Sequence, residues 1–259
     1  MSEQQLTEKQ LLLARDRVEV KYFFPLDKIE KLISYISPFM KADQYARGES
    51  NRACYRVGSV YFDGLDKDYY WSHVEGYPHR RKVRIRQYGL GKDEVFFLEV
   101  KEKMFVSSKK YRWVLDRALV DKIKRCLNHQ EFYSCLEQSS VTPEYAEMKR
   151  SIGFDVVKYR IRPVLFVDFM RMPFVSKEDS SLRLTVDYDI QASQAVYPLF
   201  LGHAHRPKVI LSPHASILEL KLNGRIPKWM EDILLTFDLR RTAFSKYRAS
   251  ADKLYNLYG

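Results

Sequence analysis

The chain has 259 residues, of which 46% are hydrophobic and 14% aromatic, a composition that excludes a disordered or fibrous protein. Its formal net charge of +11 is typical of proteins that bind an anionic partner: nucleic acid, a membrane surface or a phosphate-rich ligand. The sequence contains no signal-peptide pattern, no run of roughly 20 apolar residues that would span a membrane, and no metal-site cysteine spacing, so we expect a cytoplasmic protein with three reduced thiols.

Alternation of polar and apolar residues predicts a chain dominated by short strands. The first predicted strand places Arg17, Glu19 and Lys21 on one face, with valines and a tyrosine on the other. The eight predicted strands cover residues 17–22, 58–63, 82–88, 95–103, 110–115, 162–172, 182–190 and 217–222.

Helical periodicity is confined to fewer segments. Apolar residues recur at helical spacing in residues 26–36, 117–127, 226–237 and 243–258, and residues 141–160 favour a helix in their first part. No linker or internal repeat divides the chain, so one domain is expected. We therefore predict an α+β protein with a closed antiparallel eight-stranded β-barrel and flanking helices. In that barrel the apolar strand faces would pack on the helices and the charged faces would line the interior.

The most basic stretch, HRRKVRIR at residues 79–86, shows this alternation clearly. Arg84 and Arg86 alternate with Val83 and Ile85, which predicts a strand with one basic face and one packed face. A solvated surface strand would explain any single pair of this kind. The pattern recurs, however, because three separate strands contain a Glu-x-Lys pair between bulky apolar neighbours: Glu19 and Lys21, Glu99 and Lys101, Glu219 and Lys221.

If these strands converge, they gather cations and a few carboxylates in one enclosed space. Buried charges need each other or a ligand, because leaving them unpaired is very costly. Arginine forks match phosphate oxygens, and carboxylates suit a hard divalent cation that bridges polyphosphate. The pattern therefore predicts a site for a phosphate-rich ligand with a metal ion.

The ordered motifs of the chain resemble a known family. They are R-x-E-x-K-Y at 17–22, VYFDGLDKDYY, RRKVRIRQYG and LEVKEK, followed by RLTVDYDI, ILELKLNGRIP and FSKYRASADKLY. From about residue 15 to the C-terminus the chain is similar to the catalytic domain of the vacuolar transporter chaperone family, a group of triphosphate tunnel metalloenzymes. The resemblance implies a single tunnel-shaped domain over residues 1–259, with residues 1–14 as an N-terminal extension.

The resemblance also implies an activity and a set of site residues. Similar members make inorganic polyphosphate from ATP with Mn²⁺ or Mg²⁺. The implied catalytic residues are Lys21, Arg84, Arg86, Lys101, Arg171 and Lys246. Further phosphate ligands would be Arg17, Lys109 or Lys110, Lys221 and Ser245. Glu219 would hold the metal, with Glu19 and Glu99 as further carboxylates.

Several features depart from the family pattern. The sequence shows neither the inositol-phosphate-sensing domain of eukaryotic relatives nor a membrane segment, so a separate membrane partner is one expectation. Phe169 stands where the family often has tyrosine. Related triphosphatases begin with Glu-x-Glu-x-Lys, whereas this chain has Arg17 at the first of those positions, which favours phosphate binding over metal binding.

Three other functions stay open. A metal-dependent triphosphatase of the same fold would release orthophosphate from tripolyphosphate or a nucleotide. A nucleic-acid-binding module is suggested by Tyr77 and Tyr88 beside the basic run, but the accompanying glutamates would repel a nucleic-acid backbone, so no nucleic acid is expected. A catalytically silent polyphosphate-binding subunit is the third. Zinc binding by His203 and His205 is not favoured, because no third ligand stands nearby.

Overall fold

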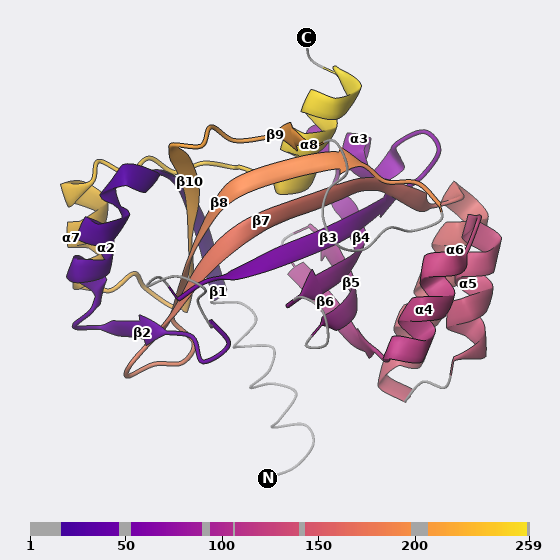
Figure 1. Ribbon diagram of the computed structural model, residues 1–259, viewed down its shortest axis with the longest axis horizontal. Helices are drawn as coiled ribbons and strands as arrows, with labels where there is room; N and C mark the ends of the chain where they lie inside the picture. The colour runs from indigo at the N-terminus through magenta and orange to yellow at the C-terminus, as the bar shows by residue number, and fades with distance from the viewer. Residues whose placement is uncertain are drawn as a thin grey trace. The chain divides into compact units, whose positions relative to one another are not determined.

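The computed structural model describes residues 17–46, 53–89, 94–105, 107–139, 143–197 and 207–257. The chain forms two compact units, each built from segments far apart in the sequence. The first unit contains Met1–Tyr55, Phe169–Ile190 and Leu211–Phe244, and the second contains Arg56–Asp168, Gln191–Ile210 and Ser245–Gly259. The long strands β7 (Arg162–Ser176) and β8 (Arg183–Gln194) contribute residues to both units (Figure 1).

The first unit contains part of a ten-stranded antiparallel sheet, with two helices on its apolar face. Its strands follow the order β1-β10-β8-β7, and the short β2 pairs with β7. The new elements are β1 (Arg17–Pro25), β2 (Met40–Ala42), β10 (Ala215–Asn223), a 3-10 turn (Leu26–Lys28), α2 (Ile29–Ile36) and α7 (Lys228–Thr236).

Alternation along these strands explains the core of the first unit. Val20 and Leu220 lie on the apolar face and are buried, together with Leu32 of α2 and Met230 of α7. Both helices have an apolar stripe that packs on this face, so the intervening positions of β1 and β10 present the opposite, charged face.

The second unit contains the part of the same ten-stranded antiparallel sheet that runs in the order β7-β3-β4-β5-β6, with the short β9 paired to β8. Its new strands are β3 (Tyr55–Asp63), β4 (His79–Tyr88), β5 (Val95–Met104), β6 (Ser107–Leu115) and β9 (Lys208–Val209). Its helices are α3 (Asp68–Val74), α4 (Arg117–Arg125), α5 (His129–Gln138), α6 (Pro143–Tyr159) and α8 (Lys246–Tyr255).

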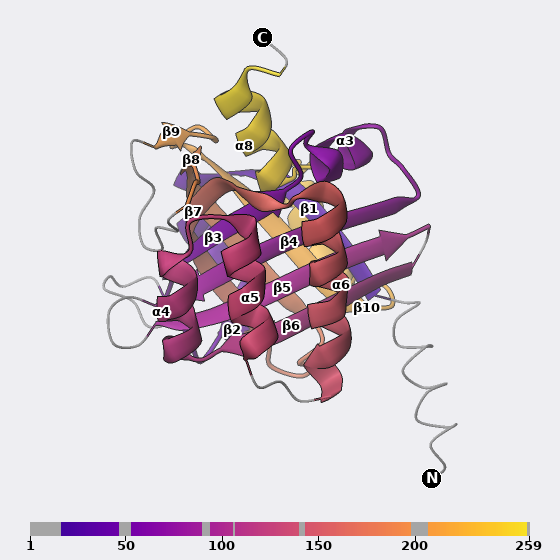
Figure 2. The ribbon, with the colours of Figure 1, turned by 90° about the vertical axis from the view of Figure 1, so that its right-hand side faces the viewer.

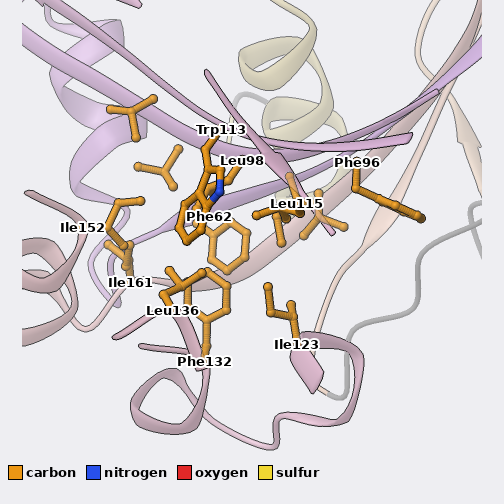
Figure 3. Close-up of a cluster of buried hydrophobic side chains, with 14 of the residues drawn as sticks. Phe62, Phe96, Leu98, Trp113, Leu115, Ile123, Phe132, Leu136, Ile152 and Ile161 are labelled. Atoms are coloured by element: carbon orange, nitrogen blue, oxygen red, sulfur yellow. The ribbon is translucent and has the colours of Figure 1, made fainter. Parts of the chain in front are cut away.

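Helices α4, α5 and α6 cover the apolar face of this part of the sheet (Figure 2). Phe62 stacks on Phe132 of α5 at a ring distance of 4.8 Å, and Leu98 and Trp113 are buried in the same cluster (Figure 3). Because one face of each strand is sealed by these helices, the alternating residues of β4, β5 and β6 must all appear on the other face.

The α+β class and the antiparallel strands with flanking helices are confirmed, and each predicted strand corresponds to a strand of the structure. The expected barrel had eight strands, whereas the described residues form one ten-stranded sheet in which β1 and β6 are the end strands, because the short β2 and β9 also pair with it. The helix expected in the first part of residues 141–160 is confirmed as α6, which extends through Tyr159. Four elements were missed: α3, α5, β2 and β9. Helix α5 has a polar composition that hides its apolar stripe, and the two short strands are defined only by their long-range partners.

Two expectations concern parts of the chain outside the described residues. The N-terminal extension at residues 1–14 and the histidine pair at 203 and 205 both fall there. The single-domain expectation stays a prediction. Within the described ranges, none of the helices combines the length and apolar character that crossing a membrane requires.

Candidate functional site

The exposed face of the second unit's part of the sheet gathers basic side chains through the register of three strands. Arg84 of β4 lies opposite Glu99 of β5, which lies opposite Arg112 of β6. One step along the strands, Lys82, Lys101 and Lys110 are opposite one another in the same way. We call this set the basic face: Lys82, Arg84, Arg86, Glu99, Lys101, Lys110 and Arg112.

Glu99 is the centre of the basic face and is almost completely buried. Its Oε2 accepts a hydrogen bond from Arg84 Nε at 2.7 Å and lies 2.6 Å from Arg84 Nη2. Its Oε1 lies 2.9 Å from Lys110 Nζ and 2.8 Å from Arg112 Nε. Arg86 Nε is 4.0 Å from Glu99 Oε2. Four basic side chains therefore surround a single carboxylate.

The surrounding charges keep Glu99 ionised. Burial alone would raise the pKa of Glu99, but Arg84, Arg86 and Lys110 outweigh burial and hold this pKa well below its usual range. Both carboxylate oxygens are engaged by arginine or lysine, so little capacity is left for a metal ion. In the structure Glu99 holds these basic side chains in position.

Two tyrosines hold the arginines of this face in place. Tyr61 Oη accepts a hydrogen bond from Arg84 Nη1 at 3.1 Å, and Tyr88 Oη accepts one from Arg112 Nη2 at 3.0 Å. Burial would raise the pKa of Tyr61, but the positive charges of Arg84 and Arg86 lower it below the ordinary value. Fixed guanidinium groups lose less conformational entropy when they bind phosphate.

The start of α8 belongs to the same site. Ser245 caps this helix by accepting a hydrogen bond from the Arg248 backbone N–H, and Ser245 Oγ also accepts one from Lys82 Nζ at 3.1 Å. Lys246 is close enough for its charge to lower the pKa of Tyr61. Two predicted residues distant in sequence from β4 are therefore beside it, where the helix N-terminus favours an anion.

Asp63 ties α8 to the sheet and was missed by sequence reasoning. Its buried carboxylate accepts backbone hydrogen bonds from Gly64 at 2.7 Å, Tyr69 at 2.8 Å and Tyr70 at 3.0 Å, and a further one from the Tyr247 hydroxyl. Burial raises the pKa of Asp63 to about 6, although these hydrogen bonds act to lower it. The Asp63 carboxylate therefore satisfies backbone N–H groups in the first turn of α3 and also holds Tyr247, the residue that follows Lys246.

Register distinguishes the two adjacent lysines of β6. Lys110 is opposite Lys101 and contacts Glu99, so it belongs to the basic face. Lys109 is opposite Glu102, whose neighbours are Arg81 and His79, on the other face of the sheet. The structure therefore brings Lys110, and not Lys109, together with the other predicted phosphate ligands.

The first unit has a face of mixed charge formed by β1 and β10. Glu19 lies opposite Lys221, and Lys21 lies opposite Glu219. Lys221 Nζ is 2.5 Å from the buried Glu219 carboxylate, while Lys21 Nζ donates to the Phe244 carbonyl at 3.2 Å. Arg17 pairs with Asn223 at the end of the same ladder. We call Glu19, Lys21, Glu219 and Lys221 the mixed-charge face.

Arg171 is held rigidly on the neighbouring strands. Its guanidinium makes a two-pronged contact with the buried Asp187, at 2.6 Å through Nε and 2.7 Å through Nη2. The same guanidinium lies 5.3 Å from the centre of the Phe169 ring. Phe169, which stands where the family often has tyrosine, thus supports Arg171 through its ring rather than through a hydroxyl.

The oxygen donors near Glu219 fit a hard divalent cation. Glu19 and Glu219 are diagonal neighbours across β1 and β10, and Thr185 is directly opposite Glu219 on β8. Thr185 Oγ1 is buried without a hydrogen-bond partner. No group of three or more histidine, cysteine or acidic residues suited to a metal occurs in the described ranges. Such a cation would need further oxygens from phosphate or water, as Mg²⁺ usually does.

The predicted residues thus form two groups, one in each unit. In the second unit the structure groups Arg84, Arg86, Glu99, Lys101, Lys110, Ser245 and Lys246. In the first unit it groups Glu19, Lys21, Arg171, Glu219 and Lys221. The neighbours absent from the predicted set are Tyr61, Asp63 and Arg112. Arg112 could have been found, because it alternates with Lys110 along β6, whereas the place of Asp63 depends on Tyr247, which is 184 positions away.

Two curated relatives are similar to almost the whole chain. Vacuolar transporter chaperone complex subunit 4 of Trypanosoma brucei brucei is 24% identical over 275 residues, and its counterpart in Trypanosoma cruzi is 23% identical over 277. Each alignment covers 93% of this chain but 34% of the relative. The chain therefore spans about a third of the length of the curated relatives it matches.

Solved structures show the same fold at low sequence identity. A Bacillus halodurans protein named as an adenylate cyclase candidate has a TM-score of 0.51 at 14% identity, covering 94% of this chain and all of that one. HpAC1 from Hippeastrum, described as having a dominant triphosphatase activity, has a TM-score of 0.53 at 16% identity, covering 92% and 96%. Both have the triphosphate tunnel fold. The VTC domain model matches residues 16–255, and the chain therefore belongs to the VTC domain family.

Proposed function

We propose that the protein is a polyphosphate polymerase, which transfers the γ-phosphate of ATP to the end of a growing inorganic polyphosphate chain. The observation that carries this proposal is the Glu99 cluster, where one buried carboxylate is surrounded by four basic side chains of β4 and β6. Four cations and one carboxylate leave a formal charge of +3. A ligand with several closely spaced negative charges is the complement of such a cluster.

The proposed reaction needs no activated protein nucleophile. A terminal oxygen of polyphosphate, already ionised at neutral pH, attacks the γ-phosphorus of ATP. A new P–O bond forms, the bond from the γ-phosphorus to its bridging oxygen breaks, and ADP leaves with that electron pair. Catalysis then consists of in-line positioning and of neutralising charge on the phosphoryl group and on ADP.

The two groups of residues have complementary roles in this proposal. Arg84, Arg86 and Lys110, fixed by Glu99 and the tyrosines, bind phosphate oxygens and stabilise the charge that develops during transfer. Lys101 and Lys246 extend the same positive field. Within the first unit, the proposed phosphate ligands are Lys21, Lys221, Arg171 and, by its place at the end of the β1 ladder, Arg17.

A divalent cation is part of the proposal, held by Glu219 with Glu19 and bound also by phosphate oxygens. Mn²⁺ and Mg²⁺ both prefer such oxygen ligands, and the cation would neutralise phosphate charge. Lys221 and Lys21 hold the two carboxylates in position, because each pairs with the glutamate two residues before it on its own strand: Lys221 with Glu219 at 2.5 Å and Lys21 with Glu19 at 3.8 Å.

The nearest alternative is a metal-dependent triphosphatase, in which water takes the place of the phosphate acceptor. It is favoured by the fold shared with HpAC1, which is described as having a dominant triphosphatase activity. Arg17 and the high net charge argue instead for binding a longer polyanion.

One incubation separates the two activities. Purified protein is supplied with ATP and Mn²⁺, the products are resolved on a polyphosphate gel, and orthophosphate is assayed in parallel. We expect a ladder that lengthens as ADP accumulates and that disappears, with at least a hundredfold loss of rate, in Arg84→Ala. Orthophosphate without a ladder would identify a triphosphatase. Neither product, with retained tripolyphosphate binding, would identify a binding subunit.

We further propose that the chain acts in the cytoplasm, where ATP is available, and delivers polymer to a separate membrane protein. The support is that the curated relatives are named as subunits of a chaperone complex. Fractionation of cells with tagged protein tests this: the tag should co-purify with a membrane protein and be released by detergent. Recovery of the tagged protein only in the membrane-free fraction, with no membrane protein bound to it, would contradict the proposed membrane partner.

A further inference from the structure

The face that bears the Glu99 cluster changes in character along the strands. At one end the register aligns Lys82, Lys101 and Lys110, and the next level contains Arg84, Glu99 and Arg112. Since a strand rises about 3.3 Å per residue, successive levels are about 7 Å apart. The face is therefore cationic over at least two levels.

Beyond these levels the same face becomes aromatic and apolar. Arg86 is aligned with Phe97 and Val114, and the next level contains Tyr88 and Val95. The two valines are exposed, and Tyr88 and Phe97 are partly exposed with their rings edge to face at 5.7 Å. A polyphosphate chain alone gives no reason for an aromatic end, because it has no apolar surface to bury.

Arg112 joins the two parts of the face and presents a flat surface. Its guanidinium lies 4.1 Å from the centre of the Phe97 ring, donates to Glu99 Oε1 at 2.8 Å and donates to Tyr88 Oη at 3.0 Å. These contacts fix one face of the guanidinium against Phe97. The Tyr88 ring centre lies 5.7 Å from the same guanidinium, and the side chain is still 40% exposed, so part of its surface can contact a planar ligand. Bases stack readily on guanidinium planes and on aromatic rings.

We infer that Phe97, Arg112 and Tyr88 form the subsite for the base of the nucleotide substrate. ATP matches the sequence of levels, with a triphosphate at one end and a planar base at the other. The base would lie beside Phe97 and Arg112, Arg86 of the same level would contact the phosphate next to the nucleoside, and the other phosphates would run toward Lys82 and Lys110. The direction of the nucleotide along β4 and β5 is then fixed by the protein. This inference rests on the proposed use of ATP.

Binding measurements test the subsite without requiring turnover. Calorimetry would give the affinities of a non-hydrolysable ATP analogue and of inorganic tripolyphosphate, which has the phosphates but no base. In Phe97→Ala we expect at least a fivefold loss of affinity for the ATP analogue, because the Arg112 guanidinium loses the ring that holds it in place for stacking, and an unchanged affinity for tripolyphosphate. Phe97→Tyr, which keeps the ring, should restore the wild-type ratio of the two affinities.

A matched control comes from the other end of the same strands. Phe105 follows β5 at the cationic end and is 72% exposed, so Phe105→Ala should change neither affinity. The inference is overturned if Phe97→Ala leaves the ratio of the two affinities unchanged, or if Phe105→Ala lowers it equally. Failure of the wild-type protein to bind either ligand would instead overturn the proposed function.

Discussion

Glu99 shows how one carboxylate can organise several cations. Its carboxylate accepts hydrogen bonds from Arg84 of β4 and Arg112 of β6 and pairs with Lys110 of β6. These contacts keep the basic side chains directed at one place without help from a substrate. Without such a partner, close cations repel one another and spread toward solvent. The same carboxylate limits the net charge, so the cluster is both stable and able to bind an anion.

Replacing Glu99 should therefore weaken the fold and strengthen anion binding. We expect Glu99→Gln to lower the free energy of unfolding by about 2 kcal/mol, less than for a fully buried pair because Lys110 and Arg112 are about half exposed. Saturating tripolyphosphate should restore most of the loss in a thermal unfolding experiment. Glu102→Gln, on the other face of the sheet, is the control. If tripolyphosphate raised the thermal stability of both variants equally, Glu99 would not be the residue that balances the charge of this cluster.

Asp63 gives a second residue-scale prediction, in the pH dependence of stability. Its pKa is raised from 3.8 to about 6 in the folded protein, so between these pH values the folded state binds more protons than the unfolded state. Its contribution to the free energy of unfolding therefore increases as the pH falls through 6. The ionised, buried carboxylate contributes least above that pH.

Comparison with Asp63→Asn isolates this contribution. Between pH 7 and pH 5 the unfolding free energy of the wild type should rise relative to the variant by about 1 kcal/mol. Denaturant unfolding at each pH measures the difference, which should stay constant from pH 7 to pH 8. A difference that is flat across the acid range would show that the pKa of Asp63 is not raised.

At the scale of elements, the register of β6 decides which lysine reaches the site. Lys109 and Lys110 are adjacent in sequence and identical in chemistry, but β5 places them opposite Glu102 and Lys101 respectively. A slip of one residue would exchange the two faces of the strand. The pair therefore offers a test in which composition and net charge are the same in both variants.

Lys110→Ala should weaken tripolyphosphate binding about tenfold, since a charge-assisted contact to phosphate is worth roughly 1.5–3 kcal/mol. Lys109→Ala should change this affinity by less than about twofold. Calorimetry with tripolyphosphate measures both, and polymer formation from ATP gives an independent readout. Equal losses in the two variants would mean that general positive charge, and not the register of β6, supplies the binding.

Helix α8 illustrates how an element can be placed by a distant residue. Its amphipathic sequence predicts a helix, but the position of Ser245 and Lys246 beside β4 depends on Asp63 holding Tyr247 and on Lys82 bonding to Ser245. Tyr70 also contacts Asp252 on the same helix. Helix α8 is thus fixed at several points by the second unit's sheet and by α3.

On the scale of the whole molecule, the sequence by itself determined the strands, most helices and the alternation that makes one strand face basic. Alternation and helical periodicity are local properties, so Arg84, Arg86, Lys21 and Glu219 could be placed on strand faces from the printed sequence. The order of the motifs was enough to indicate the family, which the match over residues 16–255 confirms.

Only the tertiary structure decided which charges meet. Strand register and order placed Glu99 among four cations, separated Lys110 from Lys109, paired Arg171 with Asp187 and brought Asp63 to Tyr247. These pairs join residues that lie far apart in the sequence, so the local periodicity of the sequence does not predict them. They depend on hydrogen-bonded ladders and packed helices that form only when the distant parts of each unit come together.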